Sequence, residues 1–227
     1  MQLSQFEVLD DMLIGDLKVV QDTRLYRFTS DSVLLTKFAT VKTGDVVADF
    51  CSGCGIVGFH LHALYPDKKF SFTLFEMQKP LSELAKKTIE YNRFENFKTE
   101  NIRLQEIPSE YNGKFSLVVC NPPYERGGLE NETYEKAVCR KEITITLEEI
   151  VAAAKKVVKF GGRFALIHRA DRVAEVCYTL KKYNFEVKKL QFVAGTGEKK
   201  PYLVMVEATL GGKPCVNVLP TLVNEGE

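Results

Sequence analysis

Apolar and polar residues alternate along the chain with two different periods. From residue 44 onward, short apolar runs rich in β-branched and aromatic residues alternate with stretches in which apolar residues recur every three or four positions. The short runs predict strands at residues 46–50, 70–75, 101–105, 115–120, 163–168, 189–193 and 202–208. The other stretches predict helices at residues 56–65, 80–94, 147–160 and 172–183. Strands that alternate with helices predict an α/β fold, in which a mostly parallel sheet carries helices on both faces.

Proline and glycine mark two of the expected helix boundaries. Pro80 stands at the start of the helix expected at residues 80–94, where its missing N–H does no harm. Gly161 and Gly162 follow the helix expected at residues 147–160. We expect these two glycines to end that helix.

The first 43 residues follow a different pattern. They contain a hairpin-like piece at residues 13–20 and a short helix at residues 31–39. This segment is too short to hold a hydrophobic core of its own. We therefore interpret residues 1–43 as an N-terminal appendage and residues 44–227 as the main domain.

Composition and charge narrow the class of protein. The chain has 227 residues, of which 45% are hydrophobic and 27% charged, which is typical of one well-cored globular domain. The formal net charge of +1 provides no global positive field, so any nucleic-acid binding must come from local patches. Four of the six cysteines stand in or beside apolar runs and are expected to be free thiols.

The sequence indicates neither export nor a membrane partner. The first residues are acidic where a signal peptide needs basic ones. No apolar run reaches the roughly 18–20 residues that a membrane span requires. We therefore expect a soluble, cytoplasmic protein with no membrane contact, and no obligate protein partner is evident.

A glycine-rich turn follows the first expected strand. The segment Asp49 to Gly58 reads DFCSGCGIVG, and Gly53, Gly55 and Gly58 fit the spacing G-x-G-x-x-G between a strand and a helix. Such a turn lets a ligand approach the backbone, and the helix N-terminus adds partial positive charge. Glu76 ends the next strand, where a carboxylate can accept hydrogen bonds from both hydroxyls of a ribose. The pattern predicts a ligand that carries a nucleoside.

Asp49 favours a cationic ligand. A carboxylate at the end of the first strand repels a pyrophosphate and attracts a sulfonium or an ammonium group. S-adenosylmethionine carries both cations, whereas NAD carries two phosphates, so the sequence favours S-adenosylmethionine as the cofactor. Cys51 and Cys54 form a C-x-x-C, but no second pair stands at zinc spacing, so we expect no metal site.

The segment Asn121-Pro122-Pro123-Tyr124 follows the expected strand at residues 115–120. The side-chain oxygen of Asn121 and the carbonyl of Pro122 can accept the two N–H bonds of a planar amine, which frees the nitrogen lone pair for attack. Each proline restricts the residue before it, so these acceptors are held in place. The ring of Tyr124 can stack on a base. We expect Asn121, Pro122 and Tyr124 to be catalytic.

Taken together, residues 49–58, 75–76 and 121–124 make the chain resemble the amino-methylating class I methyltransferases that depend on S-adenosylmethionine. Segments around and outside these three motifs narrow the resemblance to one family. Residues 24–39, 121–142, 166–172 and 211–220 are similar to the bacterial tRNA(Val) adenine-N6 methyltransferase family, which modifies the adenosine just 3′ of the anticodon. The resemblance implies a Rossmann-like α/β fold with a seven-stranded sheet whose last strand is antiparallel, and a tRNA substrate.

The resemblance also implies roles for individual residues. Asn121 and Tyr124 match target-base positions. Relatives place an Asp near the adenine of the cofactor after the third strand, where this chain has Gln105 and Glu106, and we favour Glu106. A segment with Tyr26, Phe28 and Asp31 closes over the cofactor in related enzymes. The expected cofactor-binding residues are Tyr26, Phe28, Asp31, Asp49, Gly53, Gly55, Glu76, Met77, Glu106 and Asn121.

Several residues carry alternative interpretations. Lys136, Arg140 and Lys141 could contact RNA beside the active site or line a solvated helix face. The lysine pairs 181–182, 188–189 and 199–200 could likewise bind phosphates or stand in solvent. His168 and Arg169 follow a strand at the same sheet edge as Asn121, where they could contact the substrate.

Three other functions compete with tRNA methylation. Enzymes that methylate N5 of a protein glutamine also use the sequence NPPY. The segments that resemble the tRNA methyltransferase family and the lysine pairs argue against this function. Asp49 and the NPPY segment disfavour an NAD-dependent oxidoreductase. A non-catalytic RNA-binding module of the same fold is the third alternative, and the intact Asn121 motif argues against it.

Overall fold

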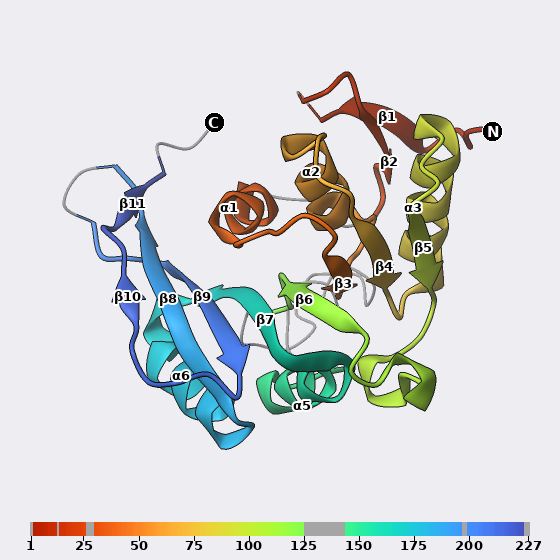
Figure 1. The fold of residues 1–227 in the computed structure, drawn as a ribbon. Helices are drawn as coiled ribbons and strands as arrows, with labels where there is room; N and C mark the ends of the chain where they lie inside the picture. Colours follow the sequence, from red (N-terminus) through yellow and green to blue (C-terminus); the bar gives the residue numbers. More distant parts are fainter. Residues whose placement is uncertain (1, 13, 26–29, 125–143, 197–198, 225–227) are drawn as a thin grey trace.

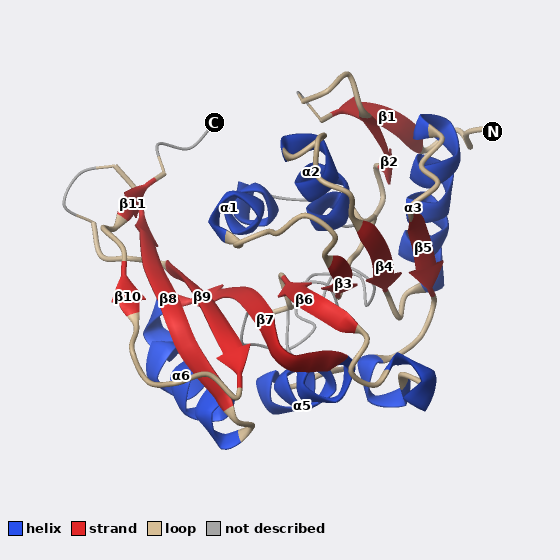
Figure 2. Ribbon diagram, viewed as in Figure 1, coloured by secondary structure: helices blue, strands red, loops and turns tan. Residues whose placement is uncertain are grey.

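The computed structural model describes residues 2–12, 14–25, 30–124, 144–196 and 199–224. A central sheet runs through the molecule, with helices packed on both of its faces (Figure 1). Helices α1 (Ser30–Phe38), α2 (Ile56–Leu64) and α3 (Lys79–Asn92) cover one face, and α5 (Leu147–Val157) and α6 (Val173–Lys182) cover the other (Figure 2). The described helices include none long and apolar enough to cross a membrane.

The sheet has the strand order β10-β8-β9-β7-β6-β3-β4-β5, and β11 also pairs with β8. Strand β9 is antiparallel to β7 and β8, and the other pairings are parallel. This arrangement confirms the α/β class and the antiparallel last long strand. The long strands are β3 (Val46–Phe50), β4 (Ser71–Phe75), β5 (Phe97–Glu100), β6 (Phe115–Cys120), β7 (Val158–Arg169), β8 (Phe185–Ala194) and β9 (Leu203–Leu210).

The expected number of seven strands is too low, because the described residues already form nine strands in this sheet. The two additional strands, β10 (Asn217–Val218) and β11 (Leu222–Val223), have two residues each and lie along the outer edge of β8. Strands this short carry no periodic signal of their own. Their position depends on backbone pairing with β8, which a local pattern cannot predict.

The prediction that Gly161 and Gly162 end a helix is wrong. Helix α5 already ends at Val157, and both glycines lie within β7. Gly161 has a φ of 74°, and the pairing of β7 with β6 shifts register between Phe115 and Leu117. The glycines therefore form a bulge in a strand, which uses the same left-handed backbone freedom as a helix end.

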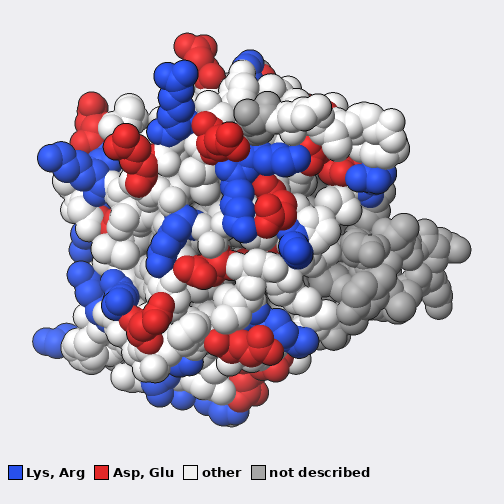
Figure 3. Space-filling model, turned by 90° about the vertical axis from the view of Figure 1, so that its right-hand side faces the viewer, with Lys and Arg blue, Asp and Glu red and all other residues white. Residues whose placement is uncertain are grey.

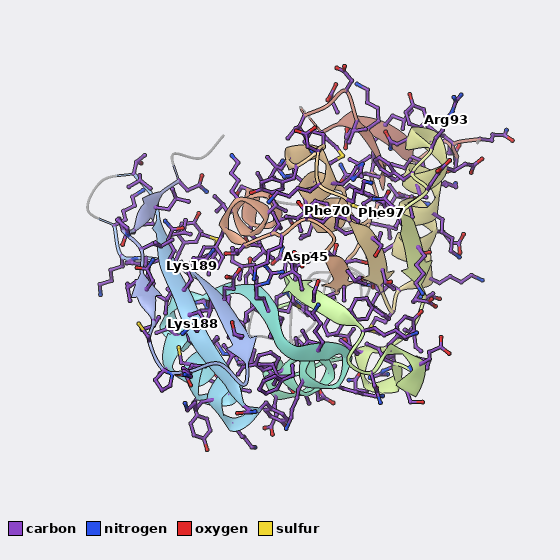
Figure 4. The ribbon with its side chains drawn as sticks, in the orientation of Figure 1. Asp45, Phe70, Arg93, Phe97, Lys188 and Lys189 are labelled. Atoms are coloured by element: carbon purple, nitrogen blue, oxygen red, sulfur yellow. The ribbon has the colours of Figure 1, made fainter. Side chains whose placement is uncertain are left out.

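The prediction of a strand at residues 101–105 is also wrong. The third parallel strand is β5, which ends at Glu100, and residues after it form a short 3-10 helix, η1 (Leu104–Glu106). Phe97, which is labelled beside β5 in Figure 4, anchors this strand in the core, because its ring stacks on Phe72 with centroids 4.3 Å apart. The residues at the sheet edge here therefore belong to a loop and a 3-10 helix.

The N-terminal residues form the hairpin of β1 (Glu7–Asp11) and β2 (Lys18–Asp22), which pair antiparallel. The hairpin is longer than the one predicted at residues 13–20, because β1 already begins at Glu7 and β2 ends at Asp22. The hairpin packs on α3, where Thr88 Oγ1 accepts from the Val20 amide at 2.9 Å and Asn92 Nδ2 donates to the Lys18 carbonyl at 2.8 Å. Its buried Val19 and Val20 belong to the same hydrophobic cluster as helices α1 to α3.

Candidate functional site

A cavity of about 240 Å³ opens at the edge of the sheet where the parallel strands end. Strands β3, β4 and β6 are neighbours and run in the same direction, so the loops that follow them meet there. The first turn of α1 closes one side. The cavity is lined by residues 31–32, 51–54, 56–57, 75–78, 102–105, 121–124 and 144–145.

The glycine turn between β3 and α2 forms part of the cavity wall. Gly53 lines the cavity with a φ of 57°, a backbone conformation that favours glycine. Gly55 has a φ of 91° but does not line the cavity. A Cβ atom at Gly55 would lie 2.6 Å from the ring of Phe59, so this glycine is needed for packing of the turn against α2. The turn therefore exposes the Gly53 backbone and buries Gly55.

Glu76 presents a carboxylate to the cavity. It follows β4, and its oxygens accept hydrogen bonds from the backbone N–H of Gly53 at 2.9 Å and of Gln78 at 2.8 Å. These bonds tie the end of β4 to the glycine turn after β3. Burial raises the pKa of the Glu76 carboxyl, and the backbone hydrogen bonds oppose that rise.

Asp49 is fully buried, at 0% exposure, and does not line the cavity. Its Oδ2 accepts from the Gly58 N–H at 2.9 Å, while its Oδ1 is buried without a hydrogen-bond partner among the described residues. Burial, together with the nearby charge of Glu76, raises the pKa of Asp49 to about 8. The site thus holds an acid whose ionisation is costly until a cation approaches.

We expect Asp49→Asn to stabilise the free protein, increasingly as pH rises. The pKa of Asp49 is about 8 in the folded chain against 3.8 for an ordinary Asp, so the folded state holds a proton that the unfolded state loses between these values. Stability contributed by that proton is present below pH 3.8 and is lost as pH rises towards 8. The neutral Asn avoids this loss. Thermal unfolding at pH 5 and pH 8 would measure it, and an equal difference between variant and wild type at both pH values would contradict it. Asp67→Asn, at an exposed position, is the matched control.

The NPPY segment lies at the end of β6, and all of its residues line the cavity. The Asn121 side-chain Nδ2 donates to Ser32 Oγ of α1 at 3.0 Å. The Tyr124 hydroxyl donates to an oxygen of Asp31, and the Tyr124 ring lies 5.7 Å from the His168 ring between centroids. Helix α1 therefore contacts both ends of this segment.

The structure brings together most of the predicted site residues that it describes. The predicted residues that line the cavity are Asp31, Gly53, Glu76, Met77, Asn121, Pro122 and Tyr124. Asp49 and Gly55 are buried and do not line it. Glu106 is exposed and does not line the cavity, but the neighbouring Gln105 does. Tyr26 and Phe28 lie outside the described residues, as do Lys136, Arg140 and Lys141.

Sequence reasoning missed several polar residues that line the cavity, among them Ser32, Arg103 and Gln105. Ser32 stands beside Asp31, which the resemblance had singled out, but no spacing rule connects it to Asn121. Arg103 and Gln105 fell within the strand wrongly expected at residues 101–105. A loop assignment there would have brought both residues to the sheet edge.

Several lysines considered for RNA contact have structural partners. Lys181 forms an ion pair with Glu186, and Lys182 Nζ lies 2.6 Å from Glu148 Oε1. Lys189 Nζ donates to Thr40 Oγ1 at 2.8 Å, and burial lowers the pKa of this lysine. These contacts favour the structural interpretation for all three. On the face beside α3 and β5, basic and acidic side chains are interspersed (Figure 3).

Curated relatives align with much of the chain at modest identity. A "tRNA1(Val) (adenine(37)-N6)-methyltransferase" of Pseudoalteromonas translucida is 23% identical over 157 residues, covering 69% of this chain and 66% of that protein. The chain thus spans about two thirds of that relative's length. A protein of the same name from Porphyromonas gingivalis W83 is 23% identical over 189 residues, covering 80% and 73% of the two chains.

Solved structures share the fold. A predicted O-methyltransferase from Agrobacterium tumefaciens superposes with a TM-score of 0.67 at 20% identity, covering 85% of this chain and 86% of its own. The M. jannaschii tRNA m1G37 methyltransferase gives a TM-score of 0.63 at 14% identity, covering 94% of this chain and 59% of its own.

The family model described as "Methyltransferase small domain" matches residues 28–196. The matched range contains the glycine turn, Glu76 and the NPPY segment, as well as most of the strands that position them. This chain therefore belongs to the methyltransferase small domain family.

Proposed function

We propose that this protein transfers a methyl group from S-adenosylmethionine to N6 of an adenosine in tRNA, with the tRNA(Val) adenosine just 3′ of the anticodon as the substrate. The observation that carries the proposal is the Asn121 side chain. Its nitrogen is bound to Ser32, which leaves its oxygen as an acceptor in a cavity that also contains the Glu76 carboxylate. The names of the curated relatives support the same reaction.

The residues of the cavity fit this cofactor. The buried Asp49 Oδ1 has no hydrogen-bond partner among the described residues, and a cation near it would compensate its charge. Glu76 offers carboxylate oxygens for the ribose hydroxyls, and the Gly53 turn exposes backbone rather than side chain. When bound, S-adenosylmethionine supplies a methyl group already activated by its sulfonium. Glu76, Gly53 and Met77 would hold it, and the buried Asp49 carboxylate would attract its cationic groups.

The chain's own residues then orient the acceptor amine. The Asn121 oxygen and the Pro122 carbonyl each accept one N–H of the adenine amino group, which draws the nitrogen out of conjugation with the ring. The two prolines hold these acceptors in fixed positions, so little reorganisation is needed during the transfer. The Tyr124 ring stacks on the base. A strong base is not needed, because the nitrogen becomes positively charged and acidic once it is methylated, and its proton then passes to water.

The activity test uses the purified chain, S-adenosylmethionine with a labelled methyl group, and tRNA from a strain in which the corresponding methyltransferase gene is deleted. Nucleoside mass spectrometry should detect N6-methyladenosine formed by the wild type. A glutamine-containing protein substrate, tested in parallel, distinguishes the rival N5-glutamine reaction. Methylation of the protein but not of the tRNA would replace the proposal with that alternative. Binding of S-adenosylmethionine with no transfer to any substrate would favour a non-catalytic module.

A tRNA substrate implies a cytoplasmic site of action and requires an RNA-binding surface around the cavity. The exposed Lys199 and Lys200 remain available for phosphate contact. We expect the affinity for tRNA to fall with rising salt concentration, since each phosphate contact releases counterions.

A further inference from the structure

Two neighbouring residues of α1 hold the two ends of the NPPY segment. Ser32 accepts a hydrogen bond from Asn121 Nδ2 at 3.0 Å, and Asp31 accepts one from the Tyr124 hydroxyl. Ser32 is 4% exposed and lines the cavity. The two partners are 89 residues apart in the chain, so this contact exists only because α1 packs beside the end of β6.

The polarity of the Asn121 side chain decides whether it can serve its proposed role. A carboxamide has an acceptor side and a donor side of nearly the same shape. With the oxygen towards the cavity, Asn121 accepts an N–H of the substrate amine. With the side chain rotated by half a turn, two donors would face each other and the amine would not be held. A serine hydroxyl can accept from the nitrogen or donate to the oxygen of this group, so Ser32 fixes the place of the carboxamide, and the N–H of the substrate amine selects the oxygen end.

Ser32 is itself held in position, because other contacts fix α1. Further along α1, Thr36 Oγ1 and His60 Nδ1 of α2 share a buried hydrogen bond of 2.8 Å. At the end of α1, the Thr40 amide donates to Glu207 of β9 at 2.6 Å, and the Thr40 carbonyl accepts from Arg163 of β7 at 3.0 Å. These contacts fix the position of α1 along its axis, and with it the position of the Ser32 hydroxyl.

We infer that Ser32 is a positioning residue for methyl transfer: its hydroxyl binds the Asn121 carboxamide and thereby holds this side chain in the rotamer that reaches the substrate amine. The inference rests on the proposed function, because it assigns Asn121 an amine substrate. Ser32 acts through Asn121 and has no chemical step of its own.

The test compares Ser32→Ala with Ser32→Thr, which retains a hydroxyl. Loss of one hydrogen bond should lower kcat about three- to tenfold. The affinity for S-adenosylmethionine, measured by calorimetry, and the thermal midpoint should stay close to those of the wild type. Ser32→Thr should restore most of the rate. Ser30→Ala is the matched control, since Ser30 is exposed in the same turn of α1.

A second measurement does not depend on turnover. The side-chain NH2 of Asn121, labelled with ¹⁵N and assigned by its loss in Asn121→Ala, should shift in Ser32→Ala and stay unchanged in Ser30→Ala. Wild-type transfer combined with an unchanged kcat in Ser32→Ala would overturn the inference while leaving the proposed function intact. An unchanged NH2 signal in Ser32→Ala would overturn it as well. A wild type that transfers no methyl group would reject the proposed function and this inference together.

Discussion

Replacing Asn121 with alanine should lower the rate of methyl transfer about 100- to 1,000-fold. This is the range observed when an enzyme loses one fixed hydrogen-bonding group that acts on the reacting centre. The loss follows because alanine retains the backbone of the NPPY segment but removes the side-chain acceptor from the cavity. Single-turnover rates with S-adenosylmethionine and tRNA would measure it.

The affinity for the cofactor separates this loss from general damage to the site. Glu76 and the Gly53 turn do not depend on the Asn121 side chain for their hydrogen bonds, so calorimetry should give nearly the same Kd for S-adenosylmethionine. Asn112→Ala, at an exposed position, is the control for removal of an asparagine side chain. Wild-type turnover by Asn121→Ala would reject the assigned role.

Replacing Arg163 with alanine should cost about 3–5 kcal/mol of the free energy of unfolding. Arg163 NH2 lies 2.6 Å and 2.7 Å from the two oxygens of Asp45, and the side chains of the pair are only 8% and 4% exposed. Asp45 lies in the interior (Figure 4), and without Arg163 its buried charge would lose its cationic partner. Ser116 Oγ, which donates to Asp45 Oδ1 at 2.6 Å, cannot replace a cation. Urea unfolding would measure the loss.

An exposed ion pair provides the comparison. Arg169 and Asp171 are 46% and 60% exposed, so Arg169→Ala should change the free energy of unfolding by less than about 1 kcal/mol. A double variant, Arg163→Met with Asp45→Asn, should recover part of the loss, because it leaves no unpaired charge. Equal effects at Arg163 and Arg169 would show that burial of the first pair has no energetic consequence.

Residues that end parallel strands could be placed together from the sequence. Glu76 and Asn121 each follow a strongly apolar strand, and the carboxyl ends of parallel strands meet at one edge of the sheet. The strand pattern therefore predicts that these side chains share a site.

Contacts that depend on helix packing could not be predicted in this way. The bond between Ser32 and Asn121 joins residues 89 positions apart and depends on how α1 lies against the sheet, which its own pattern does not specify. The position of Glu106 illustrates a different difficulty. The strand expected at residues 101–105 lies earlier in the chain, and residues 104–106 form a 3-10 helix. As a result Gln105 lines the cavity and Glu106 does not. At Gly161, the same glycine preference fitted both a helix end and a bulge.

The two short strands at the outer edge of β8 have a consequence for handling this protein. Strand β10 pairs at Lys189 and Leu190, and β11 pairs at Val193 and Ala194, so together they occupy backbone groups that an open sheet would offer to another chain. Forms of the protein shortened before residue 217 would expose this edge. They should aggregate by strand pairing between molecules even though every residue of the cavity is retained.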